Sequence, residues 1–180
     1  MKRKSKHKFF LLISGIYIVL IVLSTVYIFA QTTGLEIGNN APEINLPDTQ
    51  GKIISLSSLR GKLVLIDFWG TWCIPCVKEQ PELSGLYKRY KDSTFTCGNG
   101  FEIYGVSLDN KKKSWMSIIK KYHIDWIQVS DLLFWTSPVA KDYNIQELPF
   151  NVLIDGNGVI IVRNLHGHDL ENQIIKLLKK

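Results

Sequence analysis

Two cysteines separated by two residues, Cys73 and Cys76, directly follow an apolar run, and this pattern restricts the fold more than any other feature. Residues 63–68 are apolar except for Asp67, which is typical of a strand covered on both faces. After Cys73 the apolar residues follow a spacing of three and four, which predicts a helix reaching about Tyr90. The cysteine pair therefore stands where a buried strand passes into a helix.

This position gives the two thiols a reversible chemistry. Residues three apart on a helix are neighbours, with Cβ atoms about 5–6 Å apart, and a disulfide needs Cα atoms about 4.4–6.8 Å apart. The helix N-terminus also favours a thiolate, because it carries roughly half a positive charge and free N–H donors. We expect Cys73 to be the nucleophile and Cys76, one turn further into the helix, to be the resolving thiol.

Two alternative roles for the cysteine pair are a static disulfide and half of a zinc site completed by His166 and His168. A disulfide between neighbours on one helix closes almost no loop and would stabilise the fold little. The two histidines lie about 90 residues further along the chain, a spacing that matches no compact zinc module.

The N-terminal 40 residues divide into three segments by charge and hydropathy. Residues 1–8 carry five Lys or Arg and no acid, and residues 9–30 carry no charge. A helix of 22 residues would be about 33 Å long, enough to cross the roughly 30 Å hydrocarbon core of a bilayer. The sequence therefore predicts a cytoplasmic basic segment (1–8), a transmembrane anchor (9–30), a polar linker (31–40) and an extracytoplasmic domain (41–180).

A cleaved signal peptide is the alternative to the anchor. The apolar region of a signal peptide is usually shorter, about 7–15 residues, and ends in a small-x-small site, whereas Ile28 is bulky. The basic segment 1–8 supplies most of the net charge of +6, because residues 31–180 carry 17 Lys or Arg against 16 Asp or Glu. This near balance gives the domain no electrostatic footprint for nucleic acid.

The rest of the domain alternates strand-like and helix-like patterns. Strands are expected at 101–108, 151–155 and 159–163, helices at 111–122, 139–143 and 170–180, and a hairpin around residues 48–51. Early strand–helix alternation followed by a hairpin predicts a three-layer α/β domain with a mixed sheet.

Several motifs together resemble a known family. Residues 67–76, Asp-Phe-Trp-Gly-Thr-Trp-Cys-Ile-Pro-Cys, are similar to the active-site signature of thioredoxins. Ala-Pro-Glu at 41–43, Asp-Thr-Gln-Gly-Lys at 48–52 and Glu-Gln-Pro-Glu-Leu at 79–83 resemble the membrane-anchored TlpA/ResA-like thiol–disulfide oxidoreductases, from about residue 41 to the C-terminus. The resemblance implies a thioredoxin fold with an N-terminal β-hairpin and an inserted strand–helix unit.

The same resemblance implies an activity. Members of this family exchange disulfides with cysteines of exported proteins, mostly as reductants, for example in cytochrome c maturation, and need no metal or organic cofactor. An upstream membrane thiol reductant would supply the electrons. The residues between the cysteines, Ile74 and Pro75, lack the histidine of strongly oxidising relatives, which favours a reductant.

The resemblance also assigns roles to residues outside the cysteine pair. Pro149 would form a cis peptide bond with Leu148, face the cysteines and present the Leu148 backbone to a bound peptide as an added strand. Asp67, expected to be buried and easily protonated, would take the proton of the resolving thiol. Trp72 and Pro75 would contribute to the substrate-binding surface.

Three further possibilities remain open. The segment 92–100 resembles an insertion and carries the third cysteine, Cys97, which we expect to be a bystander rather than a third redox partner or an intermolecular link. A peroxiredoxin-like thiol peroxidase is one alternative function. In Gly70-Thr71-Trp72, however, the threonine is not at the distance from the cysteine that this family requires, and the family's earlier proline is missing. A protein that binds clients or metal without turnover is the other.

Overall fold

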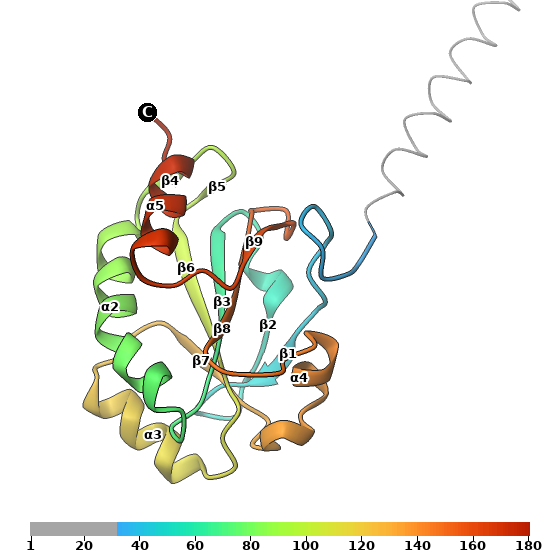
Figure 1. Cartoon of the computed structure of the whole chain (residues 1–180), viewed down its shortest axis with the longest axis vertical. Coiled ribbons are helices and arrows are strands. Elements are labelled where there is room, and N and C mark those ends of the chain that lie inside the picture. Colours follow the sequence, from blue (N-terminus) through green and yellow to red (C-terminus); the bar gives the residue numbers. More distant parts are fainter. Residues whose placement is uncertain (1–31) are drawn as a thin grey trace, which may run out of the picture. The chain divides into compact units, whose positions relative to one another are not determined.

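A five-stranded mixed sheet, in the order β7-β6-β3-β8-β9, forms the centre of the structure (Figure 1). β3 is the middle strand and pairs parallel with β6 and antiparallel with β8. All residues of β3 and β6 are buried, as the continuous apolar sequence of β3 predicts. The strands are β3 (Leu63–Trp69), β6 (Phe101–Ser107), β7 (Ile127–Val129), β8 (Phe150–Ile154) and β9 (Ile160–Arg163).

The computed structural model describes residues 32–180. The expected basic segment and membrane anchor, residues 1–30, lie outside this range. Among the helices of residues 32–180, none has both the length and the apolar character that crossing a membrane requires.

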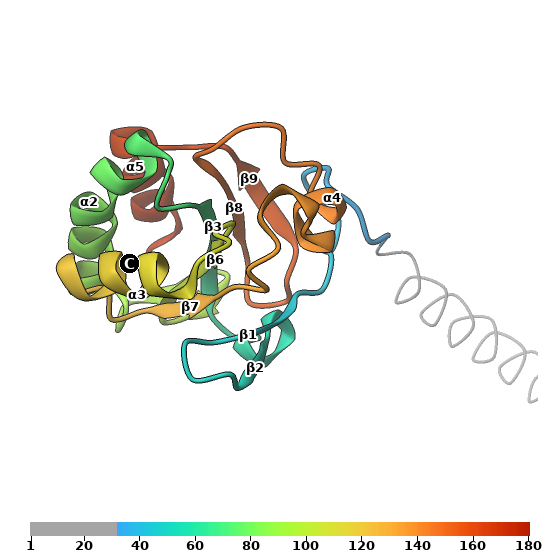
Figure 2. The same ribbon diagram turned by 90° about the horizontal axis from the view of Figure 1, so that it is seen from below.

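Helices and short elements cover both faces of the sheet, which gives the three layers seen in Figure 2. One face carries three helices: α2 (Ile74–Tyr90), α3 (Lys112–Lys121) and α5 (Gly167–Leu177). The other face carries α4 and the N-terminal hairpin with the turn after it: α4 (Pro138–Asp142), β1 (Asn45–Pro47), β2 (Ile53–Ser55) and the 3₁₀ helix η1 (Leu56–Leu59).

The expected thioredoxin-like fold with a mixed sheet is therefore confirmed, including its N-terminal hairpin. Between β6 and β8 the chain adds α3 and β7, and β7 extends the sheet as a parallel edge strand. The insertion at 92–100 forms a small hairpin of β4 (Thr94–Phe95) and β5 (Gly98–Asn99). Cys97 lies in its turn as a half-buried free thiol, without a bond to the other two cysteines.

Alternation along β3 divides the apolar core into two clusters. Val64, Ile66 and Phe68 pack toward the hairpin and α4, and Leu65 and Trp69 pack toward the three helices. Successive side chains of a strand point to opposite faces. Asp67 therefore shares the helix-covered face with Leu65 and Trp69, which is the face on which α2 begins.

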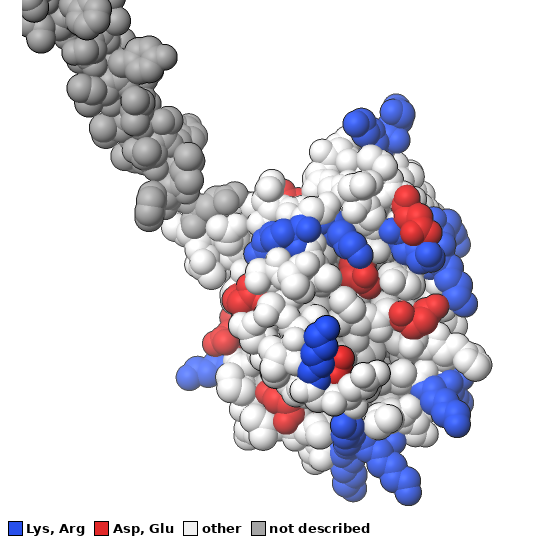
Figure 3. Space-filling model, turned by 180° about the vertical axis from the view of Figure 1, so that it is seen from behind, with Lys and Arg blue, Asp and Glu red and all other residues white. Residues whose placement is uncertain are grey.

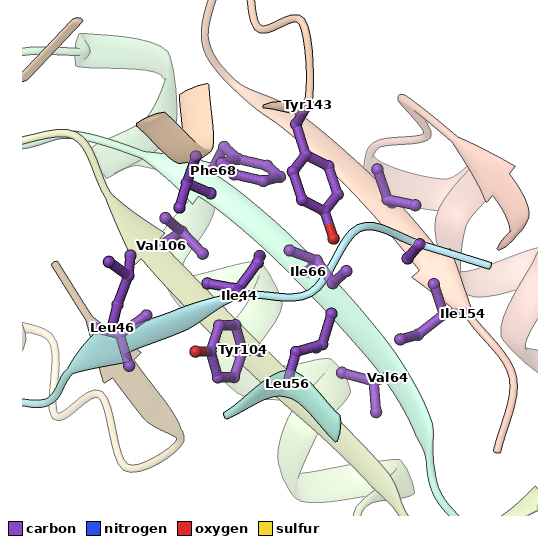
Figure 4. Close-up of a cluster of buried hydrophobic side chains, with 14 of the residues drawn as sticks. Ile44, Leu46, Leu56, Val64, Ile66, Phe68, Tyr104, Val106, Tyr143 and Ile154 are labelled. Carbon is purple, nitrogen blue, oxygen red and sulfur yellow. The ribbon is translucent and has the colours of Figure 1, made fainter. Parts of the chain in front are cut away.

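The N-terminal extension is part of the folded core (Figure 4). Ile44 is fully buried beside Ile66 and Tyr104. Two tyrosine hydroxyls donate hydrogen bonds to backbone carbonyls of the extension, from Tyr104 to Ile54 at 2.7 Å and from Tyr143 to Pro42 at 2.6 Å. The hairpin therefore closes one face of the sheet with both apolar and polar contacts.

Residues 32–40 are the part of the expected linker that the structure describes. Their backbone bonds to β9 and the turn before it: the N–H of Gly38 donates to Ile160 at 2.9 Å. The Arg163 guanidinium donates to the Leu35 carbonyl at 2.8 Å.

Charged side chains are distributed over the surface of the domain. On the face shown in Figure 3, Lys and Arg are interspersed with Asp and Glu. This face therefore presents both signs of charge, in agreement with the balanced composition of residues 31–180.

We predict that Ile44→Ala lowers the free energy of unfolding by about 2–4 kcal/mol, because it leaves a cavity in a closed core. Ile53→Ala is the matched control, since Ile53 lies in the same hairpin but is 56% exposed. Urea unfolding measures both. Equal, small effects would show that the extension does not contribute to the folded core.

Candidate active site

Cys73 and Cys76 form a disulfide at the N-terminus of α2, with Cα atoms 5.3 Å apart. Cys73 is the N-cap residue, and its sulfur accepts a hydrogen bond from the Cys76 backbone N–H at 3.2 Å. Both are buried, but Cys73 keeps 5% of its surface exposed and Cys76 only 1%. The helix N-terminus thus acts directly on the Cys73 sulfur, where it stabilises a thiolate.

A groove runs beside the disulfide. Its lining includes Pro75, which lies between the two cysteines, and Pro149, and its volume is about 390 Å³. The Leu148–Pro149 peptide bond is cis, as the family resemblance implies. The remaining lining residues are Glu79, Glu82, His166 and Gly167. Two acidic residues and a histidine therefore face a groove next to the redox pair.

Exposed aromatic rings stand next to Cys73. Trp72 is 43% exposed and contacts the rings of Phe134 and Trp135, with centroids 5.1 and 5.6 Å away. Its indole N–H donates to the Leu108 carbonyl at 2.9 Å, which fixes the ring. Phe134 and Trp135 belong to the 3₁₀ helix η2 (Phe134–Thr136). We call Trp72, Phe134 and Trp135 the aromatic surface.

The segment before Cys73 is tied to the end of β6 through Asp109. This carboxylate is 3% exposed and accepts hydrogen bonds from the Thr71 hydroxyl at 2.6 Å and the Ser107 hydroxyl at 2.7 Å. The Thr71 backbone N–H also donates to it at 3.2 Å. Asp109 therefore holds the strand–helix junction in place, a role that the sequence alone did not indicate.

Asp67 is buried on the helix-covered face, with 2% exposure. Its Oδ2 atom has no hydrogen-bond partner among the described residues. The pKa of this carboxyl is raised to about 8, first by burial and then by the negative charge of Glu79, while the positive charge of His166 opposes the rise. The carboxyl is therefore protonated at neutral pH and titrates in the range where thiols titrate.

Glu79 and His166 form an ion pair in the groove. The Nδ1 atom of His166 lies 2.8 Å from Oε1 of Glu79, and their side chains are 33% and 12% exposed. The hydrogen bond with Glu79 raises the pKa of His166 against the opposing effect of burial. The sequence singled out both residues but did not join them, because they are 87 positions apart.

The structure brings together most of the residues selected from the sequence. The disulfide pair and Pro75 adjoin the cis-proline, and Asp67 lies on the face where α2 starts. Trp69 is buried, and its indole N–H donates to Gln128 at 3.0 Å. Asp109 and the η2 rings were missed, because no local motif marks them.

This fold, with a disulfide-bonded Cys-x-x-Cys pair at a helix start and a cis-proline lining the same groove as Pro75, defines the class of thioredoxin-like thiol–disulfide oxidoreductases. A family model described as the AhpC/TSA family matches residues 37–163, and the chain belongs to this family. It is similar to the thiol–disulfide oxidoreductase ResA of Bacillus subtilis (strain 168), with 35% identity over 162 residues covering 88% of this chain and 85% of the relative. The protein is thus a ResA-like thiol–disulfide oxidoreductase.

Other relatives and solved structures agree with this class. ResA of Bacillus cereus (strain ATCC 10987 / NRS 248) is 33% identical over 170 residues, covering 91% of this chain and 92% of the relative. The thioredoxin domain of a thiol–disulfide oxidoreductase from Bacteroides vulgatus superposes with a TM-score of 0.71 at 36% identity, covering 79% of this chain and 98% of that one. A thiol:disulfide interchange protein from Bacteroides sp. gives 0.68 at 36% identity, covering 79% and 90%.

We predict that Asp67→Asn stabilises the oxidised protein above about pH 5. The folded protein keeps the Asp67 proton up to pH about 8, whereas the unfolded chain loses it near pH 3.9. Between these values the stability of the wild type falls as pH rises, and the amide removes this loss. The gain in unfolding free energy should be on the order of 5 kcal/mol at pH 8 and near zero at pH 4.

Urea unfolding at the two pH values measures this difference. A gain that is the same at pH 4 and pH 8 would show that the Asp67 carboxyl ionises normally in the folded protein.

Proposed function

We propose that the protein reduces disulfides of exported proteins by exchange through Cys73 and Cys76. The observation that carries this proposal is the position of Cys73 at the N-cap of α2. There its sulfur accepts a hydrogen bond from the Cys76 backbone N–H and forms a disulfide with the Cys76 sulfur. In the reduced enzyme the Cys73 thiolate attacks one sulfur of the client disulfide. A mixed disulfide forms, and the other client sulfur leaves as a thiolate that takes a proton from water.

Cys76 then completes the reaction. Its thiol loses a proton, and the resulting thiolate attacks the Cys73 sulfur of the mixed disulfide. The Cys73–Cys76 bond forms, the bond to the client breaks, and the client is left with two thiols. The client is reduced by two electrons and the enzyme pair is oxidised. An upstream membrane thiol reductant would return the pair to the dithiol.

Asp67 is the proposed acceptor of the Cys76 proton. It lies buried on the face where α2 packs, with one side-chain oxygen unpaired among the described residues. With a pKa of about 8, about a tenth of the Asp67 carboxyl is ionised at pH 7. This fraction takes the Cys76 proton and then passes it to water.

Trp72, Pro75, Leu148 and Pro149 are the proposed client-binding residues. A cis-proline directly before β8 leaves the Leu148 backbone beside the disulfide, where an extended client segment can pair with it. The aromatic surface next to Cys73 would take apolar side chains near the client cysteine, because exposed rings form strong contacts with little loss of side-chain entropy.

The direction and place of the reaction are part of the proposal. Ile74 and Pro75 supply no histidine to hold an unusually stable thiolate, which supports a reductant. The uncharged segment 9–30 and the basic segment 1–8 support a membrane anchor with the domain outside the cytoplasm. Proteins exported with oxidised cysteines, such as apocytochromes c awaiting haem attachment, are the expected clients. Neither a metal nor an organic cofactor enters the proposed chemistry.

A thiol peroxidase is less well supported. The hydroxyl of Thr71, two residues before Cys73, donates to the buried Asp109 carboxylate at 2.6 Å. It is therefore engaged away from the sulfur and is not available to polarise a peroxide there. Slow, bulk-thiol kinetics with hydrogen peroxide are expected.

We predict that, in the reduced protein at pH 7, iodoacetamide labels Cys73 about fivefold or more faster than free cysteine, because a lowered thiol pKa raises the thiolate fraction. Cys76 should react more slowly than Cys73. Cys97→Ser is used throughout, so that the third thiol does not contribute.

Cys76→Ser should accumulate a mixed disulfide with a client peptide, which mass spectrometry assigns to Cys73. Equal labelling of both sulfurs, or labelling of Cys76 first, would contradict the assigned roles.

We predict that Trp135→Ala and Trp72→Ala each raise KM about tenfold for a disulfide-containing peptide with apolar residues beside its cysteines. Trp135→Ala is the cleaner variant, because it lies outside the cysteine motif. Oxidised glutathione, which lacks such residues, should be reduced at nearly the wild-type rate. Met116→Ala, at another exposed apolar position on α3 (45% exposed), is the control. If the tryptophan variants lose activity equally with the peptide and with oxidised glutathione, this would argue against a role of these rings in docking the client.

A further inference from the structure

We propose that His166 is a positioning residue for the exchange reaction, which holds the Glu79 carboxylate in the groove and links it through Asn151 to the strand that carries Asp67. This inference rests on the proposed function, because the proton it concerns is the one that Cys76 releases. It adds the His166–Glu79 ion pair to the proposed proton transfer between Cys76 and Asp67.

The contacts of the imidazole indicate a cation. Nδ1 lies 2.8 Å from Oε1 of Glu79, and Nε2 lies 3.1 Å from Oδ1 of Asn164. Oxygen acceptors face both ring nitrogens, and only the protonated imidazole donates from both. His166 is the N-cap residue of α5 but makes no side-chain cap hydrogen bond. Its ring is thus directed to the groove rather than used to start the helix.

The backbone before His166 is held by Asn151. The side chain of Asn151 is a two-point clamp: its amide group donates to the Leu165 carbonyl at 2.6 Å, and its oxygen accepts from the Leu165 N–H at 3.1 Å. The same amide nitrogen lies 3.4 Å from Nδ1 of His166. The backbone next to His166 is therefore held by a buried residue of β8.

Asn151 also connects this pair to Asp67. In the register of β3 and β8, Asn151 is the residue directly opposite Asp67. Cross-strand neighbours on one face have Cβ atoms about 4.5–5.5 Å apart. The histidine, the glutamate and the buried carboxyl therefore belong to one cluster, which the groove of Pro75 and Pro149 opens to solvent.

The charges in this cluster explain what the histidine does. Asp67 faces it from β3, and Glu79 and Glu82 face it from α2. Two nearby carboxylates oppose each other's ionisation. Glu79 makes it harder for Asp67 to release a proton, and the charge of His166 makes it easier. By pairing with Glu79, the imidazolium thus favours the ionised form of Asp67, which takes the proton from Cys76 and then passes it to water in the groove.

The test is a set of single variants. His166→Gln keeps a donor but removes the charge, and Glu79→Gln removes the opposing charge. His166→Arg restores a cation, and His168→Gln is the control, since His168 is an exposed histidine two residues away. Carbon-detected NMR of the full chain in detergent, in the oxidised state, follows the Asp67 carboxyl from pH 5 to pH 10. Stopped-flow kinetics of mixed-disulfide resolution give the corresponding pH profile.

We expect the Asp67 titration midpoint to rise by about 0.5 pH unit or more in His166→Gln and to fall in Glu79→Gln, because the two charges act in opposite directions. His166→Arg should return it to near the wild-type value, and His168→Gln should leave it unchanged. The pH midpoint of the resolution rate should move in the same direction as the carboxyl. Folding of each variant is checked by its NMR spectrum.

An unchanged Asp67 midpoint in both His166→Gln and Glu79→Gln would overturn the inference. So would a shift in His166→Gln that His166→Arg does not reverse, because it would indicate a structural rather than an electrostatic effect. These outcomes are separate from the proposed function, since the NMR titration uses the oxidised protein and needs no turnover. Loss of client reduction with an intact NMR response would instead count against the proposed function alone.

Discussion

The junction between β3 and α2 depends on how firmly β3 is held. This strand is buried along its whole length and hydrogen-bonded on both edges, parallel to β6 and antiparallel to β8. Because it cannot shift by one residue without turning its apolar side chains to the wrong face, the point where it ends is fixed. Cys73 therefore stands at the first turn of α2, where the backbone N–H groups reach its sulfur.

The same constraint accounts for the buried acid. Alternation along β3 directs Asp67 to the face on which α2 packs, between Leu65 and Trp69. An ionised carboxyl at this buried position destabilises the fold. Stability alone would favour an apolar residue there. Keeping the carboxyl there is understandable if a proton must be stored beside a thiol, a compromise between stability and chemistry that active sites commonly show.

Two different kinds of surface adjoin the disulfide, one aromatic and one charged. Exposed rings of Trp72 and Trp135 lie next to Cys73, and the groove lined by Glu79 and His166 adjoins Pro75. The first suits apolar contact with a client segment, and the second suits proton handling. Asp109 ties the chain before Cys73 to β6. The proposed client binding and the proposed proton transfer therefore depend on different residues.

The sequence by itself determined the local features: the buried strand, the helix beginning at the cysteines, the hairpins and the pairing of the two thiols. Each depends on residues close together in the chain, whose periodicity and spacing can be read directly. Only the tertiary structure decided which distant groups meet. In the sequence, Glu79 stood only within a family motif and His166 only as a possible zinc ligand, and no motif marked Trp135. Their contacts depend on the register of β3 with β8 and on how α5 and η2 pack, and no local pattern encodes these arrangements.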